Sequence, residues 1–556
     1  MSSRPIDREV KLDPDDPLAR MEQTFPQLSQ EMASRIAAYG SEEKVERGQI
    51  LYERGRRGVD FFLVIAGRID VFDIDECGEQ RTFISMEERQ FLGELNLFHN
   101  RPSLFNARAA VDSRVVRVQR QEFQRLVSVE PDIGEVILRA LILRRVGIIK
   151  HVFGGVVVVG SGRHGDTVRL QRFLTRNTYP YRMLDTDTDP DAAQFLAHFA
   201  IDIHDLPVVI APGAKIIRNP SDVALAEELG LTEIFDPAQI FDVAIVGGGP
   251  AGLSAAVYAA SEGLTAVVLE ASATGGQAAT SSKIENYLGF PTGISGQALT
   301  GRAQVQAQKF GAKFAVARAV VDLDCRDQPY KLRLDDNETV AARAVVIASG
   351  ARYRKLDVPN YERFEGQGIH YAATALEARL CADKEAVLIG GGNSAGQAAM
   401  YLSRRVAHLY MLVRGNGLAA TMSEYLITRI KSSPKITLLT RTEITALAGD
   451  DGLRQITWRN RDTQAAETHA IENLFVMIGA DPNTAWLNGC LALDPQGFVK
   501  TGFGADGIPL DSPFATTLPG IYAVGDVRSG SVKRIASGVG EGSIVIQAVH
   551  RHLNPH

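Results

Sequence analysis

The chain reads FDVAIVGGGPAG from residue 241 to residue 252, an apolar run that leads straight into a glycine-rich turn. Such a run predicts a buried β-strand followed by a helix. Gly247 permits the tight turn, Gly249 lets the backbone approach a pyrophosphate, and Gly252 lets the helix pack on the strand. The next predicted strand ends in Glu270, which is placed to accept hydrogen bonds from a ribose. This stretch therefore predicts an α/β fold with a doubly wound parallel sheet that binds a dinucleotide.

A second fingerprint begins at Gly390, again after an apolar run. Gly392 takes the second position and Ala395 the third, as the variant motif allows. The following strand, predicted at 409–413, ends in Arg414, where an acid would favour NAD. An arginine accommodates a 2′-phosphate, so we predict NADPH in preference to NADH; the alternative is an ordinary arginine at a strand end. The predicted contacts are Gly390, Gly392, Asn393, Ser394 and Arg414.

Composition excludes several classes of protein. A chain of 556 residues exceeds one hydrophobic core, so several domains are expected. The net charge of −6 argues against nucleic-acid binding, and we find no apolar run long enough to span a membrane. The four cysteines, Cys77, Cys325, Cys381 and Cys490, form no Cys-x-x-Cys pair and have no metal-ligand spacing. We therefore expect reduced, mostly structural thiols, no metal site and a cytoplasmic, bacterial-type enzyme.

From about residue 240 onward, the sequence resembles the low-molecular-weight thioredoxin reductases of the pyridine nucleotide–disulfide oxidoreductase superfamily. The segments that carry this resemblance are Gly247–Gly252, Glu270, Gly275-Gly276-Gln277, Ile284-Glu285-Asn286-Tyr287, Ala348-Ser349-Gly350 and Val524-Gly525-Asp526-Val527. The resemblance implies a homodimer and an FAD domain in two parts, 240–352 and 480–556, around an NADPH domain at 353–479. It also implies hinges near Arg354 and Gly479.

The FAD contacts come from the first fingerprint, from the resemblance and from the Gly-Asp pair near the C-terminus. A carboxylate that follows the apolar strand 521–524 can point at the ribityl chain of a flavin. The predicted FAD contacts are Gly247, Gly249, Gly252, Glu270, Gly276, Gln277, Asn286, Gly525 and Asp526.

The redox dithiol of the resembled family is missing. Family members carry Cys-Ala-Thr-Cys shortly before the second fingerprint, where this chain has Ala372 and Ala375 instead of both cysteines and Leu376 instead of an acid. A methyl group cannot replace the thiolate nucleophile of disulfide exchange. His370 and Cys381 are the remaining catalytic candidates, with a buried structural cysteine as the alternative for the latter. We expect hydride transfer from NADPH to FAD and on to another acceptor: a disulfide on a partner, a quinone, an iron–sulfur or flavin carrier, or oxygen.

Residues 155–231 alternate strands and helices and include Leu206-Pro207. This order resembles the thioredoxin/glutaredoxin fold, whose proline is cis. The loop at the position of its active site, Ser161 to His164, holds no cysteine. We predict a redox-silent domain that serves either for docking or as a spacer.

Residues 21–150 follow a polar tail, 1–20, which we predict to be flexible. Apolar runs at 61–65 and 69–72 predict a tight hairpin around Gly67. A helix is predicted at 133–150, with Arg139, Arg144 and Arg145 on its solvated face.

The segment Gly93-Glu94, with Pro102-Ser103 after it, resembles the phosphate-binding cassette of cyclic-nucleotide-binding domains. The resemblance implies that Glu94 binds a ribose hydroxyl and that an arginine binds the cyclic phosphate. Ser103 stands in place of that arginine, which weakens the expected affinity, although Arg101 or Arg108 could compensate. A cyclic nucleotide or another small ligand would then regulate the enzyme.

Two alternatives remain open. One is a redox-inert protein that senses nucleotides or serves as a scaffold, because both redox loops lack cysteine. The other is an enzyme similar to ferredoxin/flavodoxin–NADP reductases, which share a cysteine-free scaffold.

Overall fold

A computed structural model describes residues 17–74, 80–94, 97–98, 102–151, 155–211, 215–233, 235–236, 238–281, 283–365, 367–450, 452–487 and 489–554. The chain divides into two compact units. The first comprises Met1–Val159, Thr178–Asp185 and Asp189–Glu233, and the second comprises Gly160–Asn177, Thr186–Thr188 and Ile234–His556. Most of the predicted tail lies outside the described residues, but Pro17–Arg20 form a short 3-10 helix, so that prediction is wrong for these four residues.

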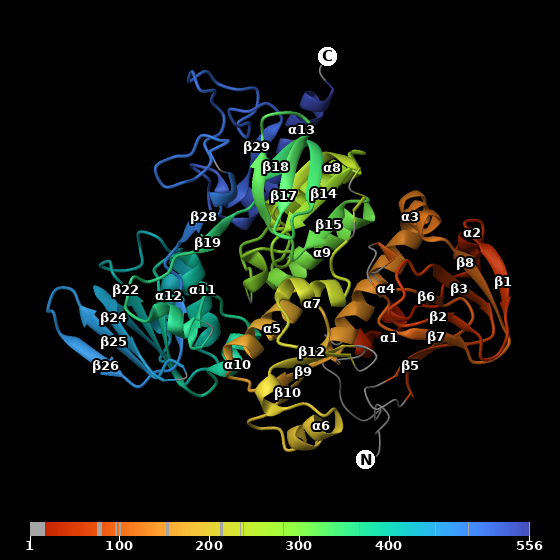
Figure 1. Ribbon diagram of the computed structural model, residues 1–556, viewed down its shortest axis with the longest axis horizontal. Coiled ribbons are helices and arrows are strands. Elements are labelled where there is room, and N and C mark those ends of the chain that lie inside the picture. Colours follow the sequence, from red (N-terminus) through yellow and green to blue (C-terminus); the bar gives the residue numbers. More distant parts are fainter. Residues whose placement is uncertain are drawn as a thin grey trace. The chain divides into compact units, whose positions relative to one another are not determined.

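The N-terminal part of the first unit consists of two four-stranded antiparallel sheets, β1-β8-β3-β6 and β2-β7-β4-β5 (Figure 1). The strands are β1 Ser41–Val45, β2 Ile50–Tyr52, β3 Phe61–Ala66, β4 Ile69–Ile74, β5 Gln80–Met86, β6 Phe91–Leu92, β7 Asn106–Ala109 and β8 Ser113–Val118. The helices are α1 Met21–Thr24, α2 Gln30–Ala37, α3 Arg120–Val129 and α4 Pro131–Lys150. Phe61 stacks on both Phe91 and Phe123, at centroid distances of 5.4 and 4.9 Å, so aromatic side chains join the sheet to the helices.

Two predictions for this part are wrong. β3 pairs with β8 and β6, whereas β4 pairs with β5 and β7, so the two strands around Gly67 lie in different sheets and form no hairpin. Both faces of β3 are covered, which a two-stranded hairpin could not achieve. Arg144 is only 4% exposed, although the helical pattern placed it on a solvated face.

The rest of the first unit holds a sheet of order β10-β9-β11-β12. Its elements are β9 Val156–Gly160, β10 Tyr181–Asp185, α6 Ala192–His198, β11 Val208–Ala211, β12 Lys215–Arg218 and α7 Asp222–Glu228. The Leu206–Pro207 peptide bond is cis. The helix between β9 and β10, α5 Gly165–Arg176, groups with the second unit. The predicted element order is confirmed, and the thioredoxin-like assignment stays a prediction.

The second unit contains the βαβ unit predicted from residues 241–252. β13 lies between β14 and β18, with parallel pairing on both sides, and β18 also pairs with β29 in parallel. The strands are β13 Ile240–Val246, β14 Ala266–Glu270, β15 Lys313–Val316, β16 Val320–Asp324, β17 Tyr330–Leu334, β18 Thr339–Ile347 and β29 Ile521–Ala523. The helices are α8 Pro250–Ser261, α9 Gly296–Lys309 and α13 Ile535–Leu553.

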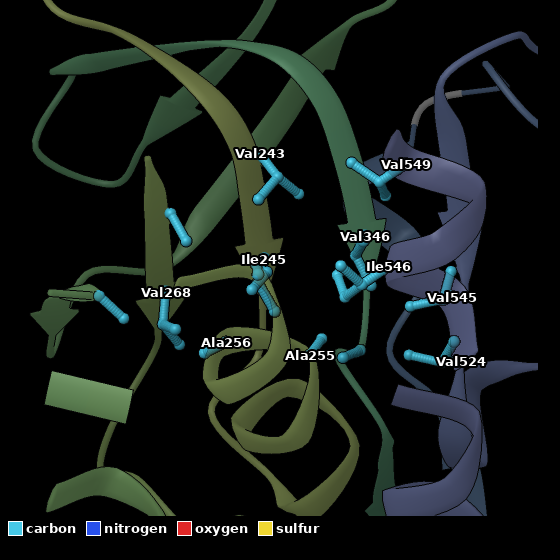
Figure 2. Close-up of a cluster of buried hydrophobic side chains, with 14 of the residues drawn as sticks. Val243, Ile245, Ala255, Ala256, Val268, Val346, Val524, Val545, Ile546 and Val549 are labelled. Atoms are coloured by element: carbon cyan, nitrogen blue, oxygen red, sulfur yellow. The ribbon is translucent and has the colours of Figure 1, made fainter. Parts of the chain in front are cut away.

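The core of this sheet lies beneath α8 and α13. Figure 2 shows Val243, Ile245 and Val346 pointing from β13 and β18 toward Ala255 of α8 and Ile546 of α13. Small residues let the two helices approach closely. A Cβ on Gly542 of α13 would lie 2.1 Å from the carbonyl oxygen of Ala251 in α8.

A second parallel sheet, of order β20-β27-β21-β22-β23, is inserted between the two halves of the first. Its elements are β20 Ile369–His370, α10 Ala375–Leu380, β21 Glu385–Ile389, α11 Asn393–Leu402, β22 His408–Val413, α12 Glu424–Ser432, β23 Ile436–Thr440 and β27 Leu474–Val476. Three further strands form a separate antiparallel sheet: β24 Thr442–Ala448, β25 Gln455–Asn460 and β26 Ala466–His469. The chain enters through β19 Ala351–Tyr353 and leaves through β28 Ala480–Pro482, which pair antiparallel (Figure 1).

Across the described residues, none of the helices combines the length and apolar character that crossing a bilayer requires. The same residues hold no cluster of side chains suited to a metal ion.

The expectation of reduced thiols is wrong for two cysteines. Cys325, just after β16, and Cys490 are joined in a disulfide, although 165 positions separate them. No local spacing reveals such a pair, because the fold alone brings the two segments together.

Loss of this disulfide should destabilise the second unit. We expect Cys490→Ser to lower the free energy of unfolding by about 2–4 kcal/mol, since the bond restricts the unfolded chain. Urea unfolding without reductant measures this. Wild-type protein treated with dithiothreitol is the matched control and should unfold like the variant; a variant as stable as the oxidised wild type would contradict the prediction.

Candidate active site

A cavity of about 1330 Å³ within the second unit is lined by the second glycine fingerprint, while residues 247–252 of the first fingerprint lie outside its lining. The flavin-side sheet and its connections contribute Gln277, Tyr353, Asp526 and Lys533. The inserted sheet contributes residues 389–395 and Arg414. A cavity of this volume exceeds what one small ligand needs.

The turn after β13 leaves no room for side chains. Gly247 has φ +108°, and a Cβ there would lie 2.3 Å from the carbonyl oxygen of Ala348. A Cβ on Gly252 would lie 1.9 Å from the carbonyl oxygen of Gly247. Helix α8 therefore starts directly above the turn, and its free N–H groups face the place of a pyrophosphate.

Glu270 ends β14 beside this turn, as predicted. Its Oε2 accepts a hydrogen bond from the backbone N–H of Gly248 at 2.7 Å, and its Oε1 accepts one from Ser272 at 3.1 Å. Each carboxylate oxygen keeps a further lone pair, so Glu270 can still accept from ribose hydroxyls.

Gly525 and Asp526 approach from the other end of the chain. The N–H of Gly525 donates to Glu541 at 2.6 Å, and Arg528 pairs with Glu541 at 2.7 Å, which fixes the loop after β29. Burial raises the pKa of Asp526 above its usual value. In the described residues this carboxyl group has no hydrogen-bond donor, although it lines the cavity. A polar chain with hydroxyl groups, such as the ribityl chain of FAD, fits this unsatisfied acceptor.

The other predicted FAD contacts differ in position. Gly276 comes close to the fingerprint, since a Cβ on it would lie 3.1 Å from Cα of Gly249. Gln277 lines the cavity and donates to the carbonyl oxygen of Ala351. Asn286 is exposed and lies outside the cavity lining.

The second fingerprint forms a similar turn. Gly390 has φ +137°, and a Cβ there would lie 2.2 Å from the carbonyl oxygen of Met477. Gly392 precedes α11, and Oδ1 of Asn393 accepts from the N–H of Ser423 at 2.7 Å. Arg414 is exposed at the cavity wall, where a 2′-phosphate could reach it.

The segment that replaces the dithiol leads into α10. Glu377 caps this helix, because its Oε2 accepts from both the N–H (3.2 Å) and the hydroxyl of Thr374. Neither Ala372 nor Ala375 lines the cavity. Cys381 is fully buried, and burial raises the pKa of its thiol to about 11, which argues against a reactive thiolate. Leu376 belongs to α10, and its side chain lies outside the described set.

His370 belongs to a buried polar cluster that the sequence did not reveal. Nη2 of Arg172 lies 3.1 Å from Nδ1 of His370, and Nε of Arg172 donates to Glu377 at 3.0 Å. Arginine is always a donor, so Nδ1 accepts and Nε2–H faces Oδ1 of Asn473 at 3.3 Å. Burial, assisted by the charge of Arg172, lowers the pKa of His370, so the ring is neutral. Arg172 lies 198 positions before His370, and no local pattern singles it out.

The cassette region of the first unit holds a much smaller cavity, of about 20 Å³. Its lining includes Glu94, Phe83, Phe105 and Arg144, and the rings of Phe83 and Phe105 stack at 5.1 Å. This volume holds about one water molecule. A cyclic nucleotide therefore fits only if these side chains move.

Arg144 explains why the cassette cavity is so small. Its guanidinium donates to the carbonyl oxygens of Thr24, Phe91 and Gly93 at 2.9–3.2 Å and lies over the ring of Phe25. Burial raises the pKa of Glu94, while Arg145, Leu104 and Ser103 act in the opposite direction. Arg108 lies over the ring of Phe72, outside the lining, and Arg101 lies outside the described residues.

Comparisons with known proteins agree with this geometry. The family model "Pyridine nucleotide-disulphide oxidoreductase" matches residues 241–542, more than half of the chain. The chain therefore belongs to this family of oxidoreductases. A model of the cyclic nucleotide-binding domain matches residues 42–130.

The similar proteins are thioredoxin reductases. That of Chlamydia pneumoniae is 33% identical over 315 residues, which cover 56% of this chain and 97% of the relative. That of Mycolicibacterium smegmatis is 34% identical over 305 residues, which cover 54% and 93%. Among solved structures, the Lactococcus lactis thioredoxin reductase has a TM-score of 0.52 at 28% identity and covers 56% of this chain and 99% of its own. That of T. acidophilum has a TM-score of 0.51 at 30% identity and covers 56% and 97%.

The close approach at Gly252 should be essential for the first nucleotide site. We expect Gly252→Ala to cost about 1–3 kcal/mol of stability and to lose bound flavin, because the methyl group would overlap the carbonyl of Gly247. The flavin content of purified protein measures this. Gly301→Ala in α9 is the control, since a Cβ there meets nothing within 4 Å; equal flavin content in both variants would contradict the prediction.

The neutral state of His370 should appear in acid stability. The folded pKa lies below the ordinary value of 6.5, so the unfolded chain takes up a proton first as the pH falls below 6.5. Wild-type protein should therefore lose stability between pH 7.5 and 5.5, and His370→Gln should lose less. Urea midpoints at both values test this, with His204→Gln, an exposed position, as control. An unchanged pH dependence in His370→Gln would refute it.

Proposed function

We propose that the second unit binds FAD and NADPH and passes a hydride from NADPH to the flavin. The observation that carries this proposal is one cavity that is lined both by the second fingerprint and by Gln277 and Asp526, two of the predicted FAD contacts. A hydride moves only between groups in contact, so a common cavity is what the reaction requires. When bound, FAD supplies the redox chemistry, and the protein supplies position and electrostatics.

The residues of the first fingerprint are proposed to hold the FAD pyrophosphate at the start of α8. Glu270 is proposed to bind the ribose. Asp526 is proposed to bind the ribityl chain, because its carboxyl group is half-buried and needs a donor. Lys533 lies in the same lining and supplies a positive charge.

NADPH rather than NADH is proposed for the second fingerprint. Among the described residues, Arg414 and Lys533 are the two cations of the cavity lining, and Arg414 directly follows β22. The lining also holds Glu443, but Arg459 pairs with this carboxylate at 3.1 Å and reduces its repulsion of a phosphate.

The acceptor is proposed to come from outside the chain. The two alanines carry no sulfur and lie away from the cavity lining, so electrons on the flavin have no dithiol to reach. A small oxidant, such as a quinone or oxygen, or a protein carrier would have to reach the flavin itself. Regulation through the N-terminal domain, the homodimer, the domain boundaries and the cytoplasmic location remain predictions.

The test is to mix the purified protein with NADPH without oxygen and follow the flavin absorption band. Rapid bleaching supports the proposal. An oxidised band that persists would refute it and favour the redox-inert nucleotide sensor.

Arg414→Ala should weaken the binding of NADPH about 10- to 100-fold, since a charge-assisted hydrogen bond contributes roughly 1.5–3 kcal/mol. The concentration of NADPH that gives half the maximal bleaching rate measures this, with NADH as the comparison ligand, which should change little. Arg404→Ala is the matched control, because Arg404 is exposed and outside the cavity lining. Equal losses for NADPH and NADH would contradict the role of Arg414.

A further inference from the structure

We call residues 353–479 the nicotinamide-binding half of the second unit, and residues 240–352 and 480–556 the flavin-binding half. Helix α5 contacts the nicotinamide-binding half through one arginine. Nε of Arg172 donates to Glu377 at 3.0 Å, and Nη2 reaches His370 at 3.1 Å. The side chain of Glu377 is only 4% exposed, so its carboxylate depends on a charged partner. Burial alone would raise the pKa of Glu377, but Arg172 and the hydrogen bond from Thr374 lower it. The carboxylate is therefore charged and buried, and its partner Arg172 is 30% exposed.

The last turn of α5 reaches the flavin-binding half. Nε2 of Gln297, in α9, donates to the carbonyl oxygen of Thr175 at 2.7 Å. The side-chain amide of Asn177 donates to the carbonyl oxygen of Ser272, just after β14, at 3.4 Å. Thr175 is three positions after Arg172, so a single helical turn contacts both halves.

The same turn lies next to the cavity. Burial raises the pKa of Tyr353, which lines the cavity, and the charge of Arg176 acts in the opposite direction. The ring of Tyr353 stacks on that of Tyr371 at 5.7 Å, one position before Ala372. α5 thus lies where the flavin side, the cavity and the former dithiol segment meet.

The other links between the two halves are of a different kind. β19 and β28 connect them covalently as a two-stranded antiparallel ribbon, an arrangement that is only marginally stable by itself. Arg429 pairs with Glu285 at 3.0 Å, but both side chains are partly exposed, at 51% and 28%, and such pairs contribute little. The contacts of α5 are partly buried, and the carboxylate of Glu377 is the least exposed partner among these ion pairs, at 4%.

We propose that α5 is a clamp that holds the nicotinamide-binding half against the flavin-binding half, with Arg172 as its positioning residue. This inference rests on the proposed function, because the cavity whose two sides the clamp holds together is the one in which the hydride would pass. Arg172 touches neither fingerprint and acts through Glu377 and His370. Ala372 and Ala375 carry no sulfur that would have to move to the flavin, so a single fixed arrangement of the two halves suffices.

The experiment compares variants at the two ends of the clamp. Arg172→Ala removes the contact with Glu377 and His370, and Gln297→Ala removes the contact with Thr175. Arg172→Lys keeps the charge but cannot make both contacts, because a lysine lacks the planar fork. Arg379→Ala is the matched control, since Arg379 is exposed on α10.

Anaerobic stopped-flow reduction of the bound flavin, at several concentrations of NADPH, is the first readout. Both alanine variants should lower the limiting rate about 10- to 100-fold, because hydride transfer is sensitive to small displacements. The half-saturating concentration of NADPH should stay within about twofold, since the second fingerprint is intact. The limiting rate of Arg172→Lys should lie between those of the wild type and Arg172→Ala, and the rate of Arg379→Ala should equal that of the wild type. Limiting rates equal to that of the wild type in both alanine variants would overturn the proposal. A lower rate that is fully explained by weaker NADPH binding or by a lower flavin content would also overturn it.

Hydrogen exchange of the flavin-loaded protein separates the clamp from the proposed function. Peptides that cover residues 165–177 and 369–381 should exchange faster in Arg172→Ala than in Arg379→Ala. This comparison tests the clamp proposal even if NADPH fails to reduce the flavin in wild-type protein. Equal exchange in the two variants would overturn the proposal.

Discussion

The close approach of backbone to backbone at the two glycine turns is the constraint on which the second unit depends. At Gly247 and Gly252, the chain passes so near its own carbonyl groups that no Cβ fits. Helix α8 can therefore start directly after the turn that ends β13, and no side chain caps its first N–H groups. Gly542 continues the same principle, because it lets α13 pack on α8 and bring the Gly525-Asp526 loop to the cavity from the far end of the chain.

The loss of sulfur in the dithiol segment leaves its scaffold in place. Thr374 and Glu377 still cap α10, so the alanines occupy an ordered helix start and not a collapsed loop. A buried, charged carboxylate is paired with Arg172, and a neutral imidazole lies beside it. These groups serve to hold parts together, because a histidine whose pKa is lowered by burial and by a neighbouring cation is a poor proton carrier at neutral pH.

The sequence predicted most of the nucleotide-binding fold and missed features that depend on distant contacts. Both βαβ units were predicted because strand, glycines and helix are contiguous, and their signals reinforce one another. The hairpin at Gly67 was wrong because pairing partners of β3 and β4 lie elsewhere in the chain. The burial of Arg144 was missed because helical periodicity assigns charged residues to solvent, whereas its guanidinium finds three carbonyl groups and two aromatic rings. The Cys325–Cys490 bond was missed because 165 residues separate its ends.

By itself, the sequence determined the class of fold, the two nucleotide fingerprints and the absence of a redox dithiol, because each of these is written in neighbouring residues. The backbone geometry of a glycine turn and the identity of a nucleophile are local properties. Tertiary structure alone decided that the second fingerprint and Asp526 line one cavity, and that Asp526 reaches it with an unsatisfied carboxyl group. It also decided that Arg172 meets His370 and Glu377, since a buried ion pair exists only where folding brings its two charges out of water together.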